Sequence, residues 1–92
     1  MIQSFRDAAS EKVFRQVPSK QYRLIEKTAL RKLIHLNQAR SLRDLAALPG
    51  NRLEALKGKR KGQHSIRIND QYRLCFTWRD GDAFDVEITD YR

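Results

Sequence analysis

Ninety-two residues, 40% of them hydrophobic and 33% charged, are typical of one globular domain rather than of a disordered chain. No apolar run approaches the roughly 20 residues of a membrane span, and the opening MIQSF has no signal-peptide core. The lone Cys75 excludes an internal disulfide. The sequence therefore predicts a single domain over residues 1–92, located in the cytoplasm, with no membrane as a partner.

The positive charge, a net +8, is unevenly placed along the chain. Residues 1–62 hold 15 Lys and Arg against 5 Asp and Glu, a net charge of +10, whereas residues 63–92 hold 4 against 6, a net charge of −2. Such asymmetry creates a directional field and is typical of nucleic-acid-binding proteins. A merely soluble basic protein is the alternative, but it leaves the uneven placement unexplained.

Helical spacing dominates the first part of the chain. Ser10 is expected to cap a short helix that continues to residue 17, and Pro18-Ser19 is expected to end it. From Ser19 to residue 40 a longer helix is predicted, because apolar residues recur at helical spacing and cations occupy the opposite face. The apolar positions are Tyr22, Ile25, Ala29, Leu33 and Leu36, and the cations are Lys20, Arg23, Lys27 and Arg31.

The period of the pattern changes after a third short helix. This helix is predicted from Ser41 to Leu48, with Asp44 as the capping-box partner, and Pro49-Gly50-Asn51 ends it. A short strand is then expected at 52–56, followed by three longer ones with alternating apolar and polar residues. Their apolar members are Ile66 and Ile68, then Tyr72, Leu74, Phe76 and Trp78, then Phe84, Val86 and Ile88.

Short connections make these strands an antiparallel meander, with a hairpin turn at Asp80-Gly81. The apolar face should receive the long helix, so the predicted fold is α+β, with N-terminal helices packed on one face of a small antiparallel sheet. Arg67 and Arg73 would then project from the other, open face. The basic loop LKGKRKG, with Lys57, Lys59, Arg60 and Lys61, leads into that face and would complete a cationic surface suited to phosphates.

The second half of the chain resembles the C-terminal half of HigB-type toxins of the RelE/ParE superfamily. The resemblance is carried by the LKGKRKG loop, the SIRIN and QYRLCF strands and the terminal Asp90-Tyr91, and the opening MIQSF also fits. It implies a RelE-like two-layer domain and ribosome-dependent cleavage of mRNA at the decoding site. It further implies a HigA-type helix-turn-helix antitoxin as partner, with operator DNA contacted only through that antitoxin, and contacts to ribosomal RNA.

The residue types present favour a chemistry without metal or other cofactor. Carboxylates are scattered rather than clustered as a two-metal nuclease needs, and no Cys/His spacing indicates zinc. Attack by a 2′-OH needs a proton acceptor, cations for the phosphorane and a proton donor for the leaving 5′-oxygen. Lys57 is expected to accept the proton, because neighbouring cations disfavour its charged form. The resemblance implies catalytic roles for Lys57, Arg73, Asp90 and Tyr91, and Arg92, which departs from the family ending, is added to this set as a clamp on the phosphate.

Two positions depart from the family pattern and leave the acid and base assignment open: Glu54 and Arg92 stand where relatives carry histidine. Nucleic-acid contacts are predicted for a wider set, Lys59, Arg60, Lys61, His64, Arg67, Asn69 and Gln71. By strand alternation His64 shares the face of Ile66 and Ile68, which favours a packed edge residue as its alternative role. Two other functions compete with the nuclease: a ParE-like topoisomerase poison and a non-catalytic RNA-binding module.

Overall fold

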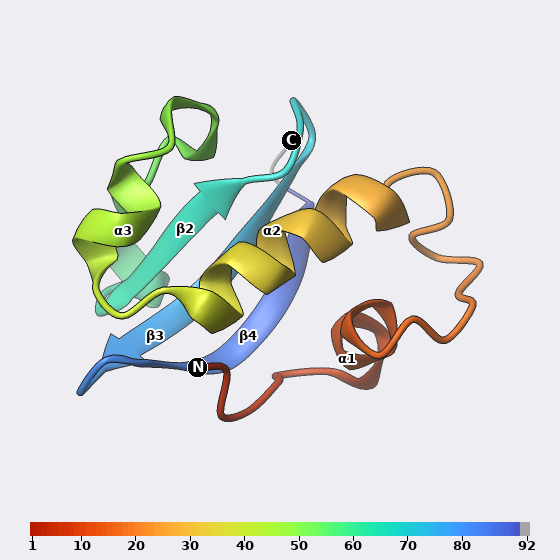
Figure 1. The fold of residues 1–92 in the computed structure, drawn as a ribbon, viewed down its shortest axis with the longest axis horizontal. Helices are drawn as coiled ribbons and strands as arrows, with labels where there is room; N and C mark the ends of the chain where they lie inside the picture. The colour runs from red at the N-terminus through yellow and green to blue at the C-terminus, as the bar shows by residue number, and fades with distance from the viewer. Residues whose placement is uncertain (91–92) are drawn as a thin grey trace.

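The computed structural model describes residues 1–90, which fold into two layers. Helix α2 (Glu26–Gln38) crosses one face of a four-stranded sheet, and α1 (Ala8–Phe14) lies beside the strand β4 (Figure 1). The remaining elements are α3 (Leu42–Ala46), the 3-10 turns η1 (Pro49–Asn51) and η2 (Gly58–Arg60), and the strands β1 (Glu54–Ala55), β2 (Gln63–Arg67), β3 (Tyr72–Arg79) and β4 (Asp82–Asp90). Among residues 1–90, no helix is long and apolar enough to cross a membrane.

The sheet is the predicted antiparallel meander, in the order β1-β2-β3-β4. The hairpin between β3 and β4 turns at Asp80 and Gly81, whose φ angles of 53° and 81° are both left-handed. That pair of angles is the one that a type I′ turn requires, and it matches the twist of the flanking strands. The α+β class and the hairpin are therefore confirmed.

The core lies between α2 and the sheet. Ala29, Leu33 and Leu36 of α2 are fully buried, as their helical spacing predicted. They pack in one cluster with buried side chains of the sheet, namely Ile66, Ile68, Leu74, Phe76, Ala83, Val86 and Ile88. Burial of each of the larger side chains in this cluster contributes about 1.5–3 kcal/mol, so the sheet is held with this face against α2 and its other face turned away.

Two helices start at other residues than predicted, and α1 ends at Phe14 rather than at residue 17. Ser10 does not cap α1, because Asp7 takes that position and its Oδ1 accepts the Ser10 N–H at 2.8 Å. The α2 helix begins at Glu26 rather than Ser19, and residues 21–25 form turns instead. Tyr22 is buried in this segment and packs edge-on against Tyr72 with ring centroids 5.9 Å apart, a tertiary contact that outweighs helical propensity.

Ser10 is instead buried, and its Oγ accepts the Ile88 N–H of β4 at 2.8 Å. Ser10→Ala should leave that amide without a partner and lower the free energy of unfolding by about 1–3 kcal/mol. Urea denaturation measures the loss, with Ser19→Ala in the α1–α2 loop as the control. Equal stability of Ser10→Ala and wild type would show that the hydrogen bond contributes nothing.

The alternation predicted for β4 is wrong at Phe84. The register shifts between Cys75 and Thr77, so that Thr77 pairs with Phe84 and Trp78 with Ala83, and Asp85 takes a left-handed φ of 52°. This bulge adds one residue to β4. In the part of β4 that precedes the bulge, the side chains that face the helices are therefore the opposite set from the predicted one. Ala83 is therefore the buried member, while Phe84 lies on the far face beneath the guanidinium of Arg79, 4.3 Å from the ring centroid.

Candidate functional site

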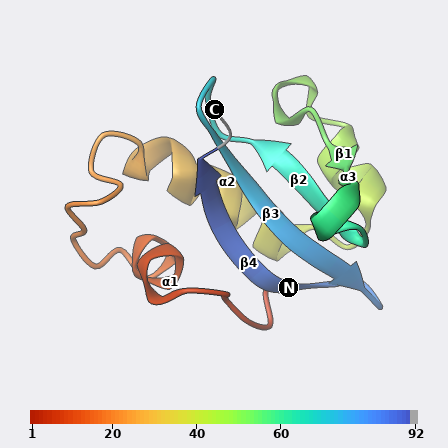
Figure 2. The same ribbon diagram turned by 180° about the vertical axis from the view of Figure 1, so that it is seen from behind.

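The face of the sheet turned away from the helices carries the candidate site; we call it the loop face. One row of paired residues crosses it, Glu54 on β1, Ser65 on β2, Cys75 on β3 and Glu87 on β4. The turn η2, green in Figure 2, lies in front of the sheet in this view. Leu56, Ser65 and Cys75 are buried although none belongs to the main core, so the loop that contains η2 covers part of a face that alternation alone predicted to be open.

Arg60 fastens that loop to the sheet. Its Nη1 lies 2.6 Å from Oε1 of Glu87 and donates to Oε1 of Gln63 at 3.0 Å. The Glu87 side chain is only 14% exposed and also faces Arg6, at 3.9 Å. Arg60 is predicted to contact nucleic acid, but here a largely buried carboxylate offsets its charge, and the ion pair attaches the loop to the sheet.

The other three cations of the loop, Lys57, Lys59 and Lys61, are exposed. Gly58 and Gly62 flank the turn with left-handed φ angles of 65° and 94°, which side chains other than glycine rarely adopt. Lys57 precedes the turn in an extended conformation and receives the Arg60 N–H on its carbonyl at 3.3 Å. The turn and its two flanking residues therefore carry three exposed ammonium groups at one end of the loop face.

Arg73 lies toward the other end of this face and is held in place by three hydrogen bonds. Its Nε donates to Ser65 Oγ at 2.7 Å, and its Nη2 donates to the carbonyl of Arg52 at 2.6 Å and to that of Ser65 at 3.4 Å. Arg67, its cross-strand partner, forms an ion pair with Asp70 in the following turn. The guanidinium of Arg73 is thus fixed across β2 before any ligand binds.

The strand register separates Lys57 from Arg73. Leu56, the neighbour of Lys57, donates its N–H to the Gln63 carbonyl, whereas Arg73 pairs with Arg67. Four residues along β2 correspond to roughly 13 Å. Long side chains from both ends can approach a phosphodiester laid along the outside of the loop that covers Ser65 and Cys75, so the candidate site is a track across the face rather than a compact cluster.

Asp90 lies at the end of β4, opposite Tyr72. Its Oδ2 accepts the side-chain amide of Gln71 at 3.0 Å. The Oδ1 of Asn69 accepts the N–H groups of Gln71 and Tyr72 at 2.9 and 2.7 Å, which closes the β2–β3 turn. Asn69 therefore builds the turn, and Gln71 links it to Asp90. The two remaining catalytic candidates, Tyr91 and Arg92, lie outside the described residues.

His64 occupies the helix side of the sheet, as alternation predicts. Its ring stacks on Phe76 with centroids 6.3 Å apart and an interplanar angle of 22°. It therefore points away from Arg73 and the loop face. Among residues 1–90, no group of three or more His, Cys, Asp or Glu is placed to hold a metal ion.

Cys75 lies under the track, and its burial raises the pKa of the thiol. Because the thiolate is the reactive form and the folded protein buries Cys75, we expect it to react with iodoacetamide at neutral pH at least about tenfold more slowly in the folded protein than in urea. Mass spectrometry of timed samples measures both rates. Equal rates would mean that the loop over Cys75 opens freely.

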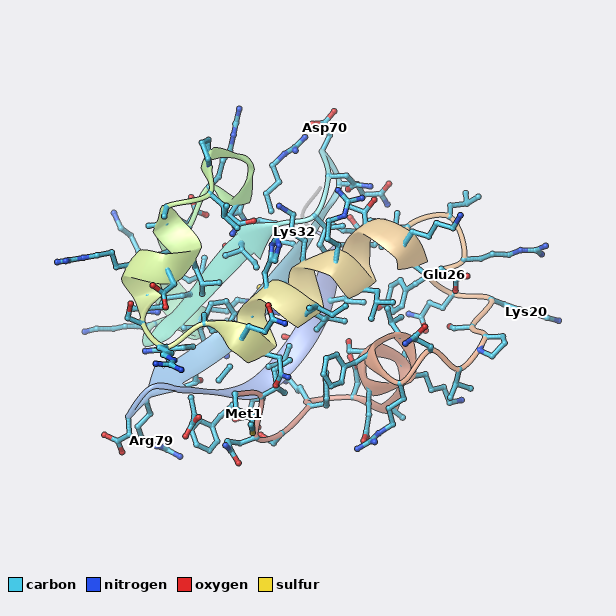
Figure 3. All side chains as sticks on the ribbon, viewed as in Figure 1. Met1, Lys20, Glu26, Lys32, Asp70 and Arg79 are labelled. Atoms are coloured by element: carbon cyan, nitrogen blue, oxygen red, sulfur yellow. The ribbon has the colours of Figure 1, made fainter. Side chains whose placement is uncertain are left out.

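The sequence did not predict the hydrogen bonds that position Arg73. Alternation already placed Ser65 on the face of Arg67, but nothing marked Arg52 as an acceptor. Lys32 of α2, labelled in Figure 3, donates to Oδ1 of the buried Asn51 at 2.5 Å and so fixes the residue before Arg52. The pKa of Lys32 is lowered, mainly because the side chain is partly buried and to a smaller extent because Arg31 and Arg67 lie nearby.

The family model and one of the similar sequences indicate the same family of toxins. Residues 3–91 match the model of a family described as RelE-like toxin of type II toxin-antitoxin system HigB. The chain is 40% identical over 96 residues to Toxin HigB-1 of Vibrio cholerae, covering 100% of this chain and 99% of that protein. An uncharacterized protein of Haemophilus influenzae is 33% identical over 68 residues, covering 74% of this chain and 63% of that one.

Among solved structures, two similar chains come from YoeB–YefM toxin-antitoxin complexes of Staphylococcus aureus. They superpose with TM-scores of 0.60 and 0.58 at 20% and 21% identity, and each comparison covers 100% of this chain and 98% of the other. At that identity the likeness concerns the fold, which is the two-layer arrangement described above.

Proposed function

Because the chain belongs to the HigB-like family, the RelE-like toxins of type II toxin-antitoxin systems, we propose that it stops translation by cutting mRNA on the ribosome. The observation that carries this proposal is the pre-positioned guanidinium of Arg73 at one end of a track whose other end holds Lys57. Fixed cations aimed at a developing charge stabilise a transition state without the cost of reorganisation.

In the proposed reaction a ribose 2′-oxygen attacks the adjacent phosphorus and loses its proton to Lys57, which accepts it as the neutral amine and becomes an ammonium. Arg73, assisted by Arg67, stabilises the charge of the phosphorane, and the bond from phosphorus to the 5′-oxygen breaks. The leaving oxygen takes a proton from Tyr91, so the products are a 2′,3′-cyclic phosphate and a 5′-hydroxyl. Asp90 orients neighbouring donors, as its bond with Gln71 illustrates, and Arg92 clamps the phosphate.

Glu54 is a second candidate for the proton acceptor. The family resemblance places it where some members carry histidine, and it pairs with Ser65 in the row of residues that crosses the loop face. It is also exposed, so its carboxylate is available to a bound ribose. Lys57→Arg and Glu54→Gln separate the two roles, because each removes one proton acceptor and leaves the other.

The partners follow from the same family. We propose a HigA-type helix-turn-helix antitoxin that holds the toxin inactive and contacts operator DNA, and a cytoplasmic ribosome whose mRNA is the substrate. The net charge of +10 over residues 1–62 supports contacts to ribosomal RNA. The two similar solved structures are themselves toxin-antitoxin complexes, which supports the antitoxin partner. Neither the matched family nor the Vibrio relative supports the topoisomerase alternative.

A cell-free translation assay tests the proposal. The purified protein should cut a translated mRNA at codon boundaries and leave the same RNA intact when ribosomes are omitted. Cleavage of naked RNA would overturn the ribosome dependence. Inhibition of DNA supercoiling without any RNA cleavage would replace the proposal with the topoisomerase alternative.

A further inference from the structure

Asn51, the last residue of η1, is joined by hydrogen bonds to both α2 and α3. It is fully buried, which is uncommon for an asparagine, and it uses both ends of its side-chain amide. Its Nδ2 donates to the Leu45 carbonyl of α3 at 3.0 Å, and its Oδ1 accepts from Nζ of Lys32 on α2 at 2.5 Å. Its backbone N–H donates to the Leu48 carbonyl at 2.9 Å. These contacts fix the point at which the chain leaves η1.

The next residue, Arg52, has an unusual backbone conformation. Its φ and ψ angles of 44° and 55° are left-handed, a region that residues other than glycine seldom occupy. A strained conformation of this kind persists only where the surrounding structure imposes it, and such residues concentrate at functional sites. The hydrogen bonds of Asn51 supply that constraint immediately before Arg52.

The carbonyl of Arg52 differs from the other acceptors of Arg73 in how it is held. Ser65 belongs to β2, so its pairing with β3 sets the position of its hydroxyl and its carbonyl. Arg52 lies between η1 and β1 and belongs to no helix or strand. The position of its carbonyl, 2.6 Å from Nη2 of Arg73, therefore depends on the anchoring of Asn51.

We propose that Asn51 is a positioning residue, which sets the orientation of the Arg73 guanidinium through the Arg52 carbonyl and is supported from α2 by Lys32. The inference rests on the proposed function, because it bears on cleavage only if Arg73 acts on the phosphorane. Since Asn51 is fully buried, it does not touch RNA, and its effect on cleavage has to pass through other residues. The alternative is a purely structural role, in which Asn51 only ties α3 to α2.

The first test observes the guanidinium itself and needs no ribosome. The Nε–H of Arg73 donates to Ser65 Oγ, so NMR should show it exchanging slowly with water. Asn51→Ala should speed that exchange about fivefold or more, the change expected when one hydrogen bond that holds the group is released. Asn37→Ala is the matched control, because it is the same substitution and removes a hydrogen bond to the Ile2 N–H instead. Equal exchange in wild type and Asn51→Ala would overturn the proposal.

A second pair of variants keeps the proposal testable if Asn51→Ala does not fold. Lys32→Met keeps most of the partly buried side chain and removes the donor to Asn51, so it should also speed the exchange of the Arg73 Nε–H, by about two- to fivefold. Arg31→Met removes the same charge from the preceding, exposed position of α2 and should leave the exchange unchanged. Equal acceleration in both variants would overturn the proposal, since the lost charge alone would then explain it.

The second test is steady-state cleavage on programmed ribosomes. Asn51→Ala should lower kcat about 10–100-fold and leave KM within about twofold, because a misplaced catalytic group slows the reaction without weakening binding. In an Arg73→Ala background the same substitution should change kcat by less than about twofold, since residues that act through one group are not additive. A further loss of about tenfold in that background would establish the purely structural role instead. If wild type cuts nothing, the proposed function fails, whereas exchange of the Arg73 Nε–H still tests the positioning.

Discussion

Replacing Lys57 by alanine should lower single-turnover cleavage of ribosome-bound mRNA by about 10²–10⁴-fold, the usual contribution of a general base. Lys57→Arg should fail nearly as badly, because a guanidinium keeps the charge but stays protonated and cannot accept the 2′-OH proton. Rapid-quench measurement of cleavage on programmed ribosomes gives the rates directly.

The controls for Lys57 lie in the same loop. Lys59→Ala and Lys61→Ala remove the same charge from exposed positions close to the same turn, and each should cost only a few-fold through weaker binding. Near-wild-type cleavage by Lys57→Arg would reduce Lys57 to a phosphate anchor. In that case Glu54→Gln should show the loss expected of the base, because Glu54 lies on the same face.

Substitution of Arg73 should have a comparably large effect. Arg73→Ala removes a fixed cation from the phosphorane and should lower the cleavage rate about 10²–10³-fold. Arg73→Lys should recover little, because one ammonium group cannot reproduce the planar fork that engages Ser65 and the Arg52 carbonyl together. The same single-turnover assay measures both variants.

Arg79→Lys is the matched control, since Arg79 belongs to the same strand and stands at the far end of the sheet from Asp70, as Figure 3 shows. It should cleave at the wild-type rate. The Tm of each variant, measured by thermal melting, shows whether a loss of activity comes from the removed contact or from unfolding of the protein. If Arg73→Lys were as active as wild type with an unchanged Tm, the fixed guanidinium would not be the source of catalysis.

Most of the architecture was predictable because the apolar pattern changes period once, from helical before residue 49 to alternating after residue 63. That change, with the Asp80-Gly81 turn, predicts an antiparallel sheet covered by α2. The bulge at Asp85 was not predictable, since no glycine marks it, and it moved Phe84 to the far face. The late start of α2 depends on Tyr22 reaching Tyr72, a contact that helical spacing does not encode.

The candidate site was predictable in its residue types but not in its geometry. Alternation placed Arg67 and Arg73 on the face opposite the core, and the glycines marked the basic loop. The pattern does not show which partners the long side chains contact. Arg60 binds Glu87, and Arg73 extends across β2 to the Arg52 carbonyl. Both contacts join residues at least 21 positions apart, so they depend on the completed sheet.

Cleavage of a programmed ribosome carrying mRNA with a single 2′-deoxy nucleotide at the cut position tests the central claim most directly. Attack by the 2′-oxygen predicts that ordinary mRNA is cut to a 2′,3′-cyclic phosphate and a 5′-hydroxyl, and that the 2′-deoxy message stays intact at that position. Cleavage of the 2′-deoxy message, or products ending in a 3′-hydroxyl and a 5′-phosphate, would contradict the mechanism and with it the roles given to Lys57 and Arg73.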